Sequence, residues 1–460
     1  MRKKLSILIK KLRNTTLRKI LVFVSRLIVG LLCLIPGYES IVDPVGSNIL
    51  CDRFLHCLKL DVLLPLSYII SISISSLQFV IGVCMTLGAK IKWTSIMATI
   101  FLTIQIITSA TTIHQCPDIY DGITRTISAH TFGSSIAHNI MLLGLASLVF
   151  HWRNYNLALY TKRTEWIISI YGFAFSVVMA IHCYFSLPIL DLTVCKEGDS
   201  IKKVLDYAES HKIDLDESTR AAMSHNGYSF ILVSPDITQA STTYRKHLNK
   251  LYSYCKSNNY NFAMLTTADP DSREVDEYII ETSGAEYPFL QISRELTDAF
   301  VRSNPELFLM KDGIVEEKFS CYQIPTYDKP LEEYVSEDKD VSEGWNDVAK
   351  SILFFGVPLI AILIYDYLIE LAKLLYRFWN FCVYCNTPKF IYWIFIWNVT
   401  ITFISPCFRP AVLNYPASFI PSYYAHGMTA LILIFFGGHW TVRCKRGVNW
   451  NAGNNRSLIN

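Results

Sequence analysis

Long apolar runs are the feature that most constrains how this chain can fold. A run of about 20 apolar residues matches the roughly 30 Å hydrocarbon core of a bilayer, and a soluble fold could not bury several of them. Charged residues make up only 18% of the 460 residues, against about a quarter in soluble proteins. The sequence therefore predicts a polytopic α-helical membrane protein of about eight spans, near residues 20–36, 62–87, 93–113, 134–151, 166–186, 351–376, 390–406 and 424–442.

Charge is divided unevenly along the chain. Residues 196–347 hold 16 Lys and Arg against 29 Asp and Glu, whereas the rest of the chain holds 26 against 10. The positive charge lies beside apolar spans rather than on a polar face, so membrane lipid is an expected partner and nucleic acid is not. We expect an acidic water-soluble domain inserted between membrane helices.

Basic residues give the spans an orientation. Residues 1–19 carry eight Lys or Arg and no acid, and the span that follows lacks a small-residue cleavage site, which predicts a retained signal anchor. Loops rich in Lys and Arg then alternate with loops that have few, and the rich ones stay in the cytoplasm. Both termini are predicted to be cytoplasmic. Residues 187–347 are predicted to be periplasmic, in a bacterial inner (cytoplasmic) membrane.

The acidic segment shows alternating strand and helix patterns in place of long apolar runs. Its β-α-β-α-β-α-β-β order resembles the thioredoxin and peroxiredoxin superfamily, which implies an α/β thioredoxin-like domain at residues 187–344. The expected strands are 227–235, 261–267, 287–292 and a pair within 306–320 joined by a turn at Asp312-Gly313.

Two features of this segment bear on thioredoxin-like chemistry. Pro305 stands where that superfamily has a cis-proline before the closing hairpin, and a trans proline that starts a strand is the alternative. The superfamily places Cys-x-x-Cys after the first strand, but residues 235–244 contain no cysteine. Without these cysteines, a domain of this resemblance is expected to be redox-inactive, with no catalytic dithiol of its own. Whether the chain is an enzyme stays open.

The first four spans, residues 20–152, resemble the DoxX/MauE family of small four-helix membrane proteins. In one bacterial subfamily a fifth span, here within 153–186, and a thioredoxin-like domain follow this block. The resemblance implies structural or binding roles for the matching residues, and allows a quinone ligand although no cofactor is evident. These residues are Arg26 and Gly30, then Asp43, Pro44 and Gly46 of PGYESIVDPVGS (36–47), and His130 of HTFGSSIAHNIMLLGLA (130–146).

The cysteines depart from the family pattern. Relatives have a Cys-Gly-Cys-Phe-Gly turn outside the third span, and here that loop reads HQCPDIYDG (114–122) with Cys116 alone. Because disulfide exchange needs two sulfurs within reach, Cys116 is a candidate reactive thiol that lacks its usual neighbour. Cys51 and Cys57, in the preceding outer loop, are its candidate disulfide partners.

Polar groups within or beside the spans are further candidates, because burying them in lipid is costly. Arg26 either snorkels to the inner face or pairs with an acid such as Asp366 or Glu370. Three histidines and two acids flank the outer ends of the third and fourth spans. Without His-x-x-x-His spacing we expect no metal there, although metal binding and proton relay remain the alternatives to a structural role. These residues are His114, His130, His138, Asp118 and Asp121.

Residues 345–460 form a C-terminal membrane domain of about three spans that lies outside the resemblance. This domain contains the sequence motif Cys382-Val-Tyr-Cys385 in a loop predicted to face the cytoplasm. The pair is either two interfacial cysteines or a cytoplasmic thiol pair for redox or metal contact. A zinc site would need further ligands.

Two functions follow from these features. One is an accessory role in envelope thiol or electron-transfer chemistry or protein maturation, of the MauE type linked to methylamine utilisation, with Cys116 as the reactive thiol and a periplasmic protein client. The alternative is a non-enzymatic membrane scaffold whose acidic domain binds a periplasmic partner. No oligomeric state follows from the sequence.

Overall fold

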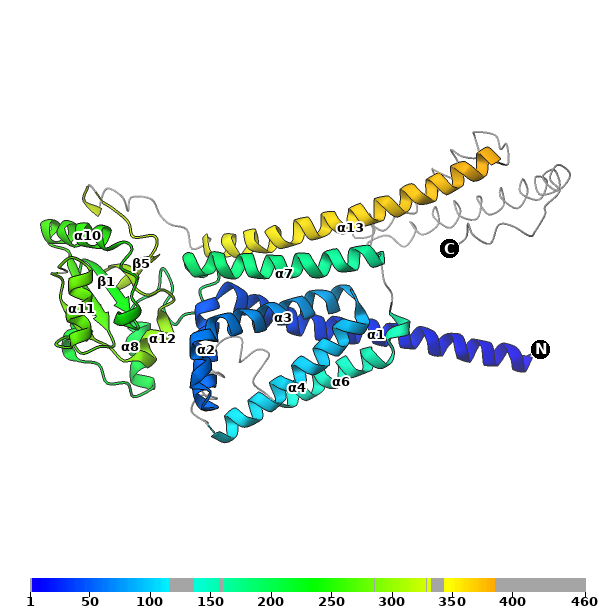
Figure 1. Cartoon of the computed structure of the whole chain (residues 1–460), viewed down its shortest axis with the longest axis horizontal. Coiled ribbons are helices and arrows are strands. Elements are labelled where there is room, and N and C mark those ends of the chain that lie inside the picture. Colours follow the sequence, from blue (N-terminus) through cyan, green and yellow to red (C-terminus); the bar gives the residue numbers. More distant parts are fainter. Residues whose placement is uncertain are drawn as a thin grey trace. The chain divides into compact units, whose positions relative to one another are not determined.

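The computed structural model describes residues 2–115, 136–156, 160–284, 286–327, 329–331 and 343–384 (Figure 1). The chain divides into two compact units, Met1–Ile362 and Leu363–Asn460. The first unit contains a five-stranded sheet and the helices that contact it.

In the described part of the chain, five helices are long and apolar enough to cross a membrane. A sixth apolar helix, α6 (Ile136–His151), is shorter. Six of the predicted spans thus appear as apolar helices, and the predicted spans at 390–406 and 424–442 lie outside the described residues. The five long segments are Thr15–Val42 of α1 (Arg2–Val42), Asp61–Leu87 formed by η1 (Asp61–Leu66) and α3 (Ser67–Leu87), Ile91–His114 of α4 (Ile91–Gln115), α7 (Lys162–Phe185), and Ala349–Arg377 of α13 (Glu343–Tyr384).

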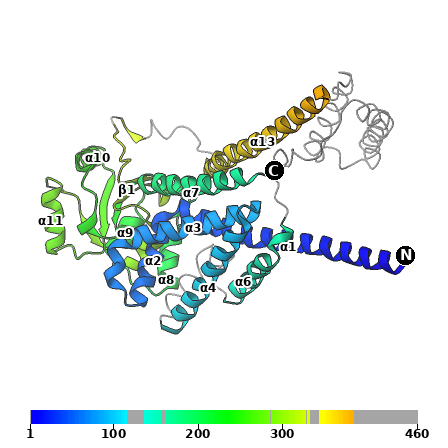
Figure 2. The same cartoon turned by 45° about the vertical axis from the view of Figure 1, so that its right-hand side comes forward.

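Glycines let α1 and α3 approach closely, as the two helices do in Figures 1 and 2. A Cβ atom at Gly82 would lie 2.5 Å from the Leu34 Cα, and one at Gly37 would lie 2.7 Å from the Phe79 backbone nitrogen. Small residues at a helix contact allow such backbone proximity in membranes, where packing replaces the hydrophobic effect as the driving force. Gly30, which the family resemblance singled out, is therefore explained as a packing residue, since a Cβ there would overlap Thr86.

The helical bundle has a buried interior and an apolar exterior. Its core joins α1, α3, α4 and α6 through residues such as Val29, Met85, Leu102 and Ala146. Large apolar side chains also point outward, among them Ile69 and Ile170. A soluble protein would not leave so many exposed, whereas lipid contact suits them.

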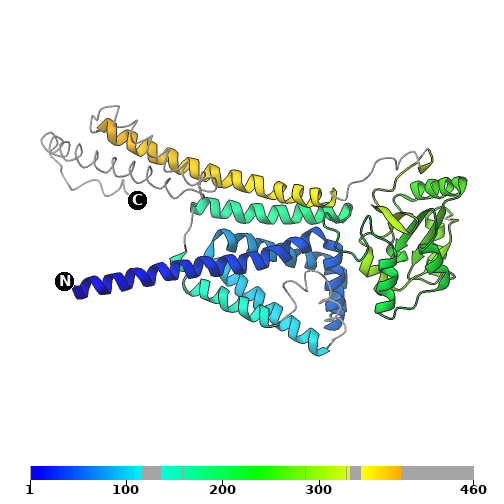
Figure 3. The ribbon, with the colours of Figure 1, turned by 180° about the vertical axis from the view of Figure 1, so that it is seen from behind.

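The short helix α2 (Pro44–Cys57) lies between α1 and α3 and runs across their ends (Figures 1 and 3). It is not among the membrane-length helices. Its first residues form the D-P-x-G-S segment of the sequence motif, so this motif marks a turn and a new helix rather than the end of a span.

The acidic segment folds as a mixed sheet in the order β3-β2-β1-β4-β5. The three leading strands are parallel, β4 is antiparallel to β1, and β4 and β5 form the predicted hairpin with Asp312 and Gly313 at positive φ. The five strands lie within the predicted residue ranges, and the peptide bond between Asn304 and Pro305 is cis, as predicted. The strands are β1 (Tyr228–Ser234), β2 (Asn261–Thr266), β3 (Phe289–Gln291), β4 (Glu306–Lys311) and β5 (Ile314–Ser320).

Helices cover both faces of this sheet and bury a separate core on each. Alternate residues of β1 enter opposite cores, with Ile231 and Val233 on one side and Phe230 and Leu232 on the other. The helices of the first face are α8 (Lys202–Ser210), α9 (Glu217–Met223) and α12 (Arg294–Phe300), and those of the second are α10 (Arg245–Asn258) and α11 (Arg273–Glu281). We call residues 187–331, from the end of α7 through this sheet, the sheet domain.

Candidate functional site

The segment between α1 and α2 fixes a buried carboxylate at the start of α2. Asp43 is the N-cap of α2, and its Oδ1 accepts a 2.9 Å hydrogen bond from the Gly46 N–H. Pro44 takes the first helical position, where a missing N–H costs nothing. A Cβ at Gly46 would overlap the Asp43 carboxylate. The Asp, Pro and Gly of the motif therefore act together to orient one side chain.

That side chain binds an arginine of the sheet domain. Nε of Arg302 donates to Oδ2 of Asp43 over 2.9 Å, and the two side chains are only 10% and 7% exposed. The same guanidinium donates through Nη1 to the carbonyls of Asp298 and Val301, at 2.8 and 2.9 Å. These carbonyls belong to the last turn of α12, where a positive charge is favourable. Arg302 thus joins α12 to α2.

A second ion pair joins α2 to α12, and here α2 supplies the cation and α12 the anion. Nη2 of Arg53 on α2 lies 2.8 Å from Oδ2 of Asp298 on α12. The α2 side therefore offers an anion and a cation, and the sheet domain offers the matching cation and anion. Such alternation fixes the register of a contact, because a shifted arrangement would bring like charges together.

The end of α7 makes a third contact with the sheet domain. Oγ of Ser320, the last residue of β5, donates to the Phe185 carbonyl over 3.1 Å. The ring of Phe185 also packs edge-on against Tyr322, with the centroids 5.2 Å apart. The contact of the sheet domain with the helices therefore includes α7 as well as α2.

The cis-proline loop next to Arg302 is held by its own domain. The Asn304 side chain donates to the Asp236 carbonyl at 2.7 Å and accepts from Ser234 at 2.6 Å, while its carbonyl accepts from the Ser241 N–H at 3.0 Å. These partners lie at the end of β1 and just after it. Pro305 thus belongs to a closed internal network.

Glu306 follows Pro305 directly and is 1% exposed. Its Oε2 accepts the backbone N–H groups of Arg302 and Ser303, the latter at 3.2 Å. In the described part of the chain, Glu306 makes no ion pair. Burial makes this carboxylate costly to ionise, and the two N–H donors offset only part of that cost.

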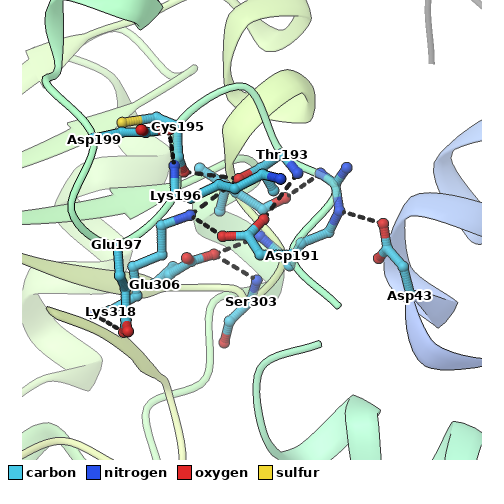
Figure 4. A network of polar contacts seen from close by, with 12 residues as sticks. Asp43, Asp191, Thr193, Cys195, Lys196, Glu197, Asp199, Ser303, Glu306 and Lys318 are labelled. Atoms are coloured by element: carbon cyan, nitrogen blue, oxygen red, sulfur yellow. Dashed lines mark hydrogen bonds and ion pairs between the residues drawn. The ribbon is translucent and has the colours of Figure 1, made fainter. Parts of the chain in front are cut away.

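Lys318 of β5 lies on the same side of the hairpin as Glu306 and is also buried (Figure 4). Its Nζ donates to Oδ2 of Asp191 over 2.8 Å and to Oγ1 of Thr193 over 3.0 Å. Its backbone N–H donates to Glu197 at 3.0 Å. Lys318 therefore anchors the chain that leads from α7 into the sheet domain.

Burial and neighbouring charge move the pKa values of this cluster in different directions. Burial raises the pKa of Glu306 to about 7, despite the opposing effect of Lys318. Burial also opposes ionisation of Asp191, but the Lys318 ammonium and the hydrogen bonds from Lys318 and Thr193 together lower the pKa of that carboxyl. For Arg302, burial is outweighed by Asp43, Glu306 and Asp191 together, which raise the pKa of the guanidinium. The cluster thus contains fixed charges and one group that titrates near neutral pH.

Arg26 lies in a different polar site, at the C-terminal end of α3. Its Nη1 donates to Asn156 Oδ1 over 2.7 Å and to the Leu87 carbonyl over 3.4 Å. Gly88 ends the helix with φ +78°, and a Cβ there would overlap this guanidinium. Arg26 is buried. Its described contacts cap the C-terminal end of α3, a helix-capping role that adds to the two sequence alternatives.

The thiols of the sheet domain are poorly placed for chemistry. Cys195, Cys255 and Cys321 are all free and buried. Burial raises the pKa of Cys195 to about 11 and that of Cys255 to about 12, so few thiolates form near neutral pH.

The outer-loop cysteines differ from one another. Cys57, at the end of α2, is disulfide-bonded, and Cys51 is a free thiol. The sulfur that pairs with Cys57 lies outside the described side chains, as do Cys116, Cys382 and Cys385. The disulfide is consistent with one of the two predicted partners of Cys116.

The predicted histidine group is only partly described. His114 is exposed near the end of α4, His138 is half-buried on α6, and His130 lies outside the described residues. Among the residues that the structure describes, no three His, Cys, Asp or Glu side chains are grouped to hold a metal ion.

The sequence motifs include Asp43, Pro44, Gly46 and Pro305. The other residues of the cluster, Arg302, Glu306, Lys318 and Asp191, lie outside any motif. One sequence signal pointed to this cluster: Glu306 and Lys318 are charged residues within a predicted hairpin whose other face is apolar. Because buried strand positions seldom hold unpaired charge, two such residues indicate a polar partner in the folded chain.

No family model matches the chain, and neither a curated protein nor a solved structure matches it. The geometry of the site is therefore the basis for assigning a function.

Proposed function

We propose that the protein is a non-enzymatic scaffold of the bacterial inner membrane, which holds an acidic thioredoxin-like domain in the periplasm to bind a protein partner. The observation that carries this proposal is the pair of ion pairs, Asp43–Arg302 and Arg53–Asp298, by which α2 holds the sheet domain. A domain fixed in this way suits presentation of a surface.

The thiols of the domain support a binding role over a redox one. A disulfide-exchange protein needs an accessible thiolate, and the three described thiols of the sheet domain are buried, with raised pKa values. The strand order and the cis-proline support a thioredoxin-like fold without a dithiol in the stretch 235–244.

Charge indicates the kind of partner. Residues 196–347 carry 29 acidic against 16 basic side chains, so a partner with a basic surface is favoured and like-charged proteins are disfavoured. The basic loops between the spans support the placement of this domain in the periplasm and of both termini in the cytoplasm.

Site-specific photo-crosslinking in cells tests the scaffold. A photoreactive amino acid is placed at Ile280, an exposed side chain on α11, in wild-type protein and in the Cys116→Ser variant. We expect the same crosslinked partner in both, and its loss when Glu274 and Glu277 are changed to Lys. A crosslink that requires Cys116, or one that survives the charge reversal, would contradict a cysteine-independent scaffold for a basic partner.

The Cys57 disulfide favours a second candidate, the accessory thiol function of the MauE type. In this candidate we propose that the sulfur bound to Cys57 is that of Cys116. Mixed disulfides trapped by acid quenching distinguish the two candidates. The accessory function predicts a client adduct that Cys57→Ser increases and Cys116→Ser abolishes, whereas the scaffold predicts none.

A further inference from the structure

Five ionisable side chains from separate parts of the chain share one buried cluster where α2 meets the sheet domain (Figure 4). Two are cations and three are carboxylates, so the fully ionised cluster has an excess of one negative charge, which a single proton would remove. The five are Asp43, Asp191, Arg302, Glu306 and Lys318.

We propose that this cluster is a proton-dependent latch, in which Glu306 takes up one proton and its neutral form tightens the contact between α2 and the sheet domain. Geometry selects Glu306 among the three carboxylates. Asp43 has Arg302 at 2.9 Å and Asp191 has Lys318 at 2.8 Å. Glu306 accepts backbone N–H groups, and the described residues give it no cation at ion-pair distance.

The groups around Glu306 come from every element packed against it. Lys318 faces it from β5 and Asp191 from the chain that follows α7, while Arg302 precedes it in the cis-proline loop. Glu197 accepts the Lys318 backbone N–H. The Arg302 guanidinium donates to the backbone carbonyl of Asp298 and to the Asp43 carboxylate of α2, while the Asp298 carboxylate pairs with Arg53. Both cations are thus already engaged by other acceptors. The pKa of about 7, which results chiefly from burial, agrees with this arrangement.

The direction of the effect follows from charge. The Arg53–Asp298 pair across the same contact adds one charge of each sign. Without Asp43, the other four groups (Asp191, Arg302, Glu306 and Lys318) sum to zero when Glu306 is ionised and to one positive charge when it is neutral. The Asp43 carboxylate is therefore attracted more strongly to the protonated form. By linkage, contact with α2 favours protonation and protonation favours the contact, so the latch loosens as pH rises through the pKa of Glu306.

The inference does not depend on which partner the sheet domain binds, and it is tested on the full chain in lipid nanodiscs. Hydrogen exchange, corrected for the intrinsic effect of pH, is measured on peptides 43–57 and 294–306 at two pH values. Protection should be about fivefold or more higher near pH 6 than near pH 8. Peptide 80–88, at the Arg26 site, should show no such change and serves as the internal control.

Three variants assign the effect to its residues. Glu306→Gln should keep the low-pH protection at both pH values, and Asp43→Asn should lower protection and reduce its pH dependence. Glu281→Gln, an exposed carboxylate on α11, should behave as wild type. Infrared spectra of the wild type should show a protonated carboxyl band near pH 6 that is lost near pH 8 and is absent from Glu306→Gln.

Equal protection of both peptides at the two pH values would overturn the latch. A Glu306→Gln protein that keeps the wild-type pH dependence would also overturn it, as would a carboxyl band that the substitution leaves unchanged. The infrared measurement on wild-type protein keeps the proposal testable if a variant folds poorly.

Discussion

Arg26 and Arg302 are both buried, yet different kinds of acceptor hold their guanidinium groups. Arg26 donates to a carbonyl and an amide at the end of α3, which are neutral groups of the helical bundle. Arg302 donates to the Asp43 carboxylate as well as to two carbonyls of α12. Both arginine side chains are largely buried, and Arg302 pairs with an opposite charge from another part of the chain, the Asp43 carboxylate.

This difference predicts how each site responds to change. A cation that caps a helix through neutral dipoles leaves behind groups that water or a neighbour can satisfy. An ion pair leaves a buried charge when one partner is removed, which is the more costly outcome. The charged site is also open to control by the titration of nearby groups.

The largest effect is expected from Arg302→Met. Because Asp43 would be left buried and unpaired, opening of peptide 43–57 should become easier by about 3–5 kcal/mol. Native-state hydrogen exchange measures this opening free energy. The double variant Asp43→Asn with Arg302→Met should recover part of the loss, because Asn still caps α2 and no charge remains. Simple addition of the two single losses would show that the pair is not coupled.

Arg26→Met should have a smaller effect, about 1.5–3 kcal/mol, because it removes hydrogen bonds from a charged donor to neutral acceptors. The exchange of peptide 80–88, at the end of α3, is the measurement. No second substitution should restore it as Asp43→Asn restores the Arg302 site. A loss greater than that of Arg302→Met would reverse the comparison.

Gly46→Ala tests whether the absence of a side chain at Gly46 is needed to hold the Asp43 carboxylate in place. The added methyl group would displace the Asp43 carboxylate and weaken the α2 cap, at a cost of about 1 kcal/mol. Gly144→Ala on α6 is the matched control, since a Cβ there meets nothing within 4 Å and alanine favours a helix. In an Asp43→Asn background the loss at Gly46 should change, because the two residues are in contact. Equal losses of stability in Gly46→Ala and Gly144→Ala would show that Gly46 has no special role in positioning Asp43.

Local patterns explain what the sequence could predict. The apolar runs, the hairpin at Asp312-Gly313 and the cis-proline at Pro305 each depend on neighbouring residues. The described residues contain the hairpin, the cis-proline and six of the apolar runs as helices. The motif around Asp43 identified a fixed side chain for the same reason. Its partner Arg302 is 259 positions away, and no periodicity or spacing connects the two. The pKa of Glu306 likewise depends on burial by segments that meet only in the folded chain.

The smallest effect is expected from Arg53→Gln. The Arg53–Asp298 pair crosses the same contact as Asp43–Arg302, but the arginine side chain is 34% exposed and water can replace it. Its loss should ease the opening of peptide 43–57 by only about 0.2–1 kcal/mol, and this difference should shrink further in high salt. Arg302→Met should show little salt dependence, because its pair is shielded from the solvent. Equal losses of stability and equal responses to salt in the two variants would show that burial does not distinguish the two ion pairs. The four charged residues would then contribute equally to the contact between α2 and α12.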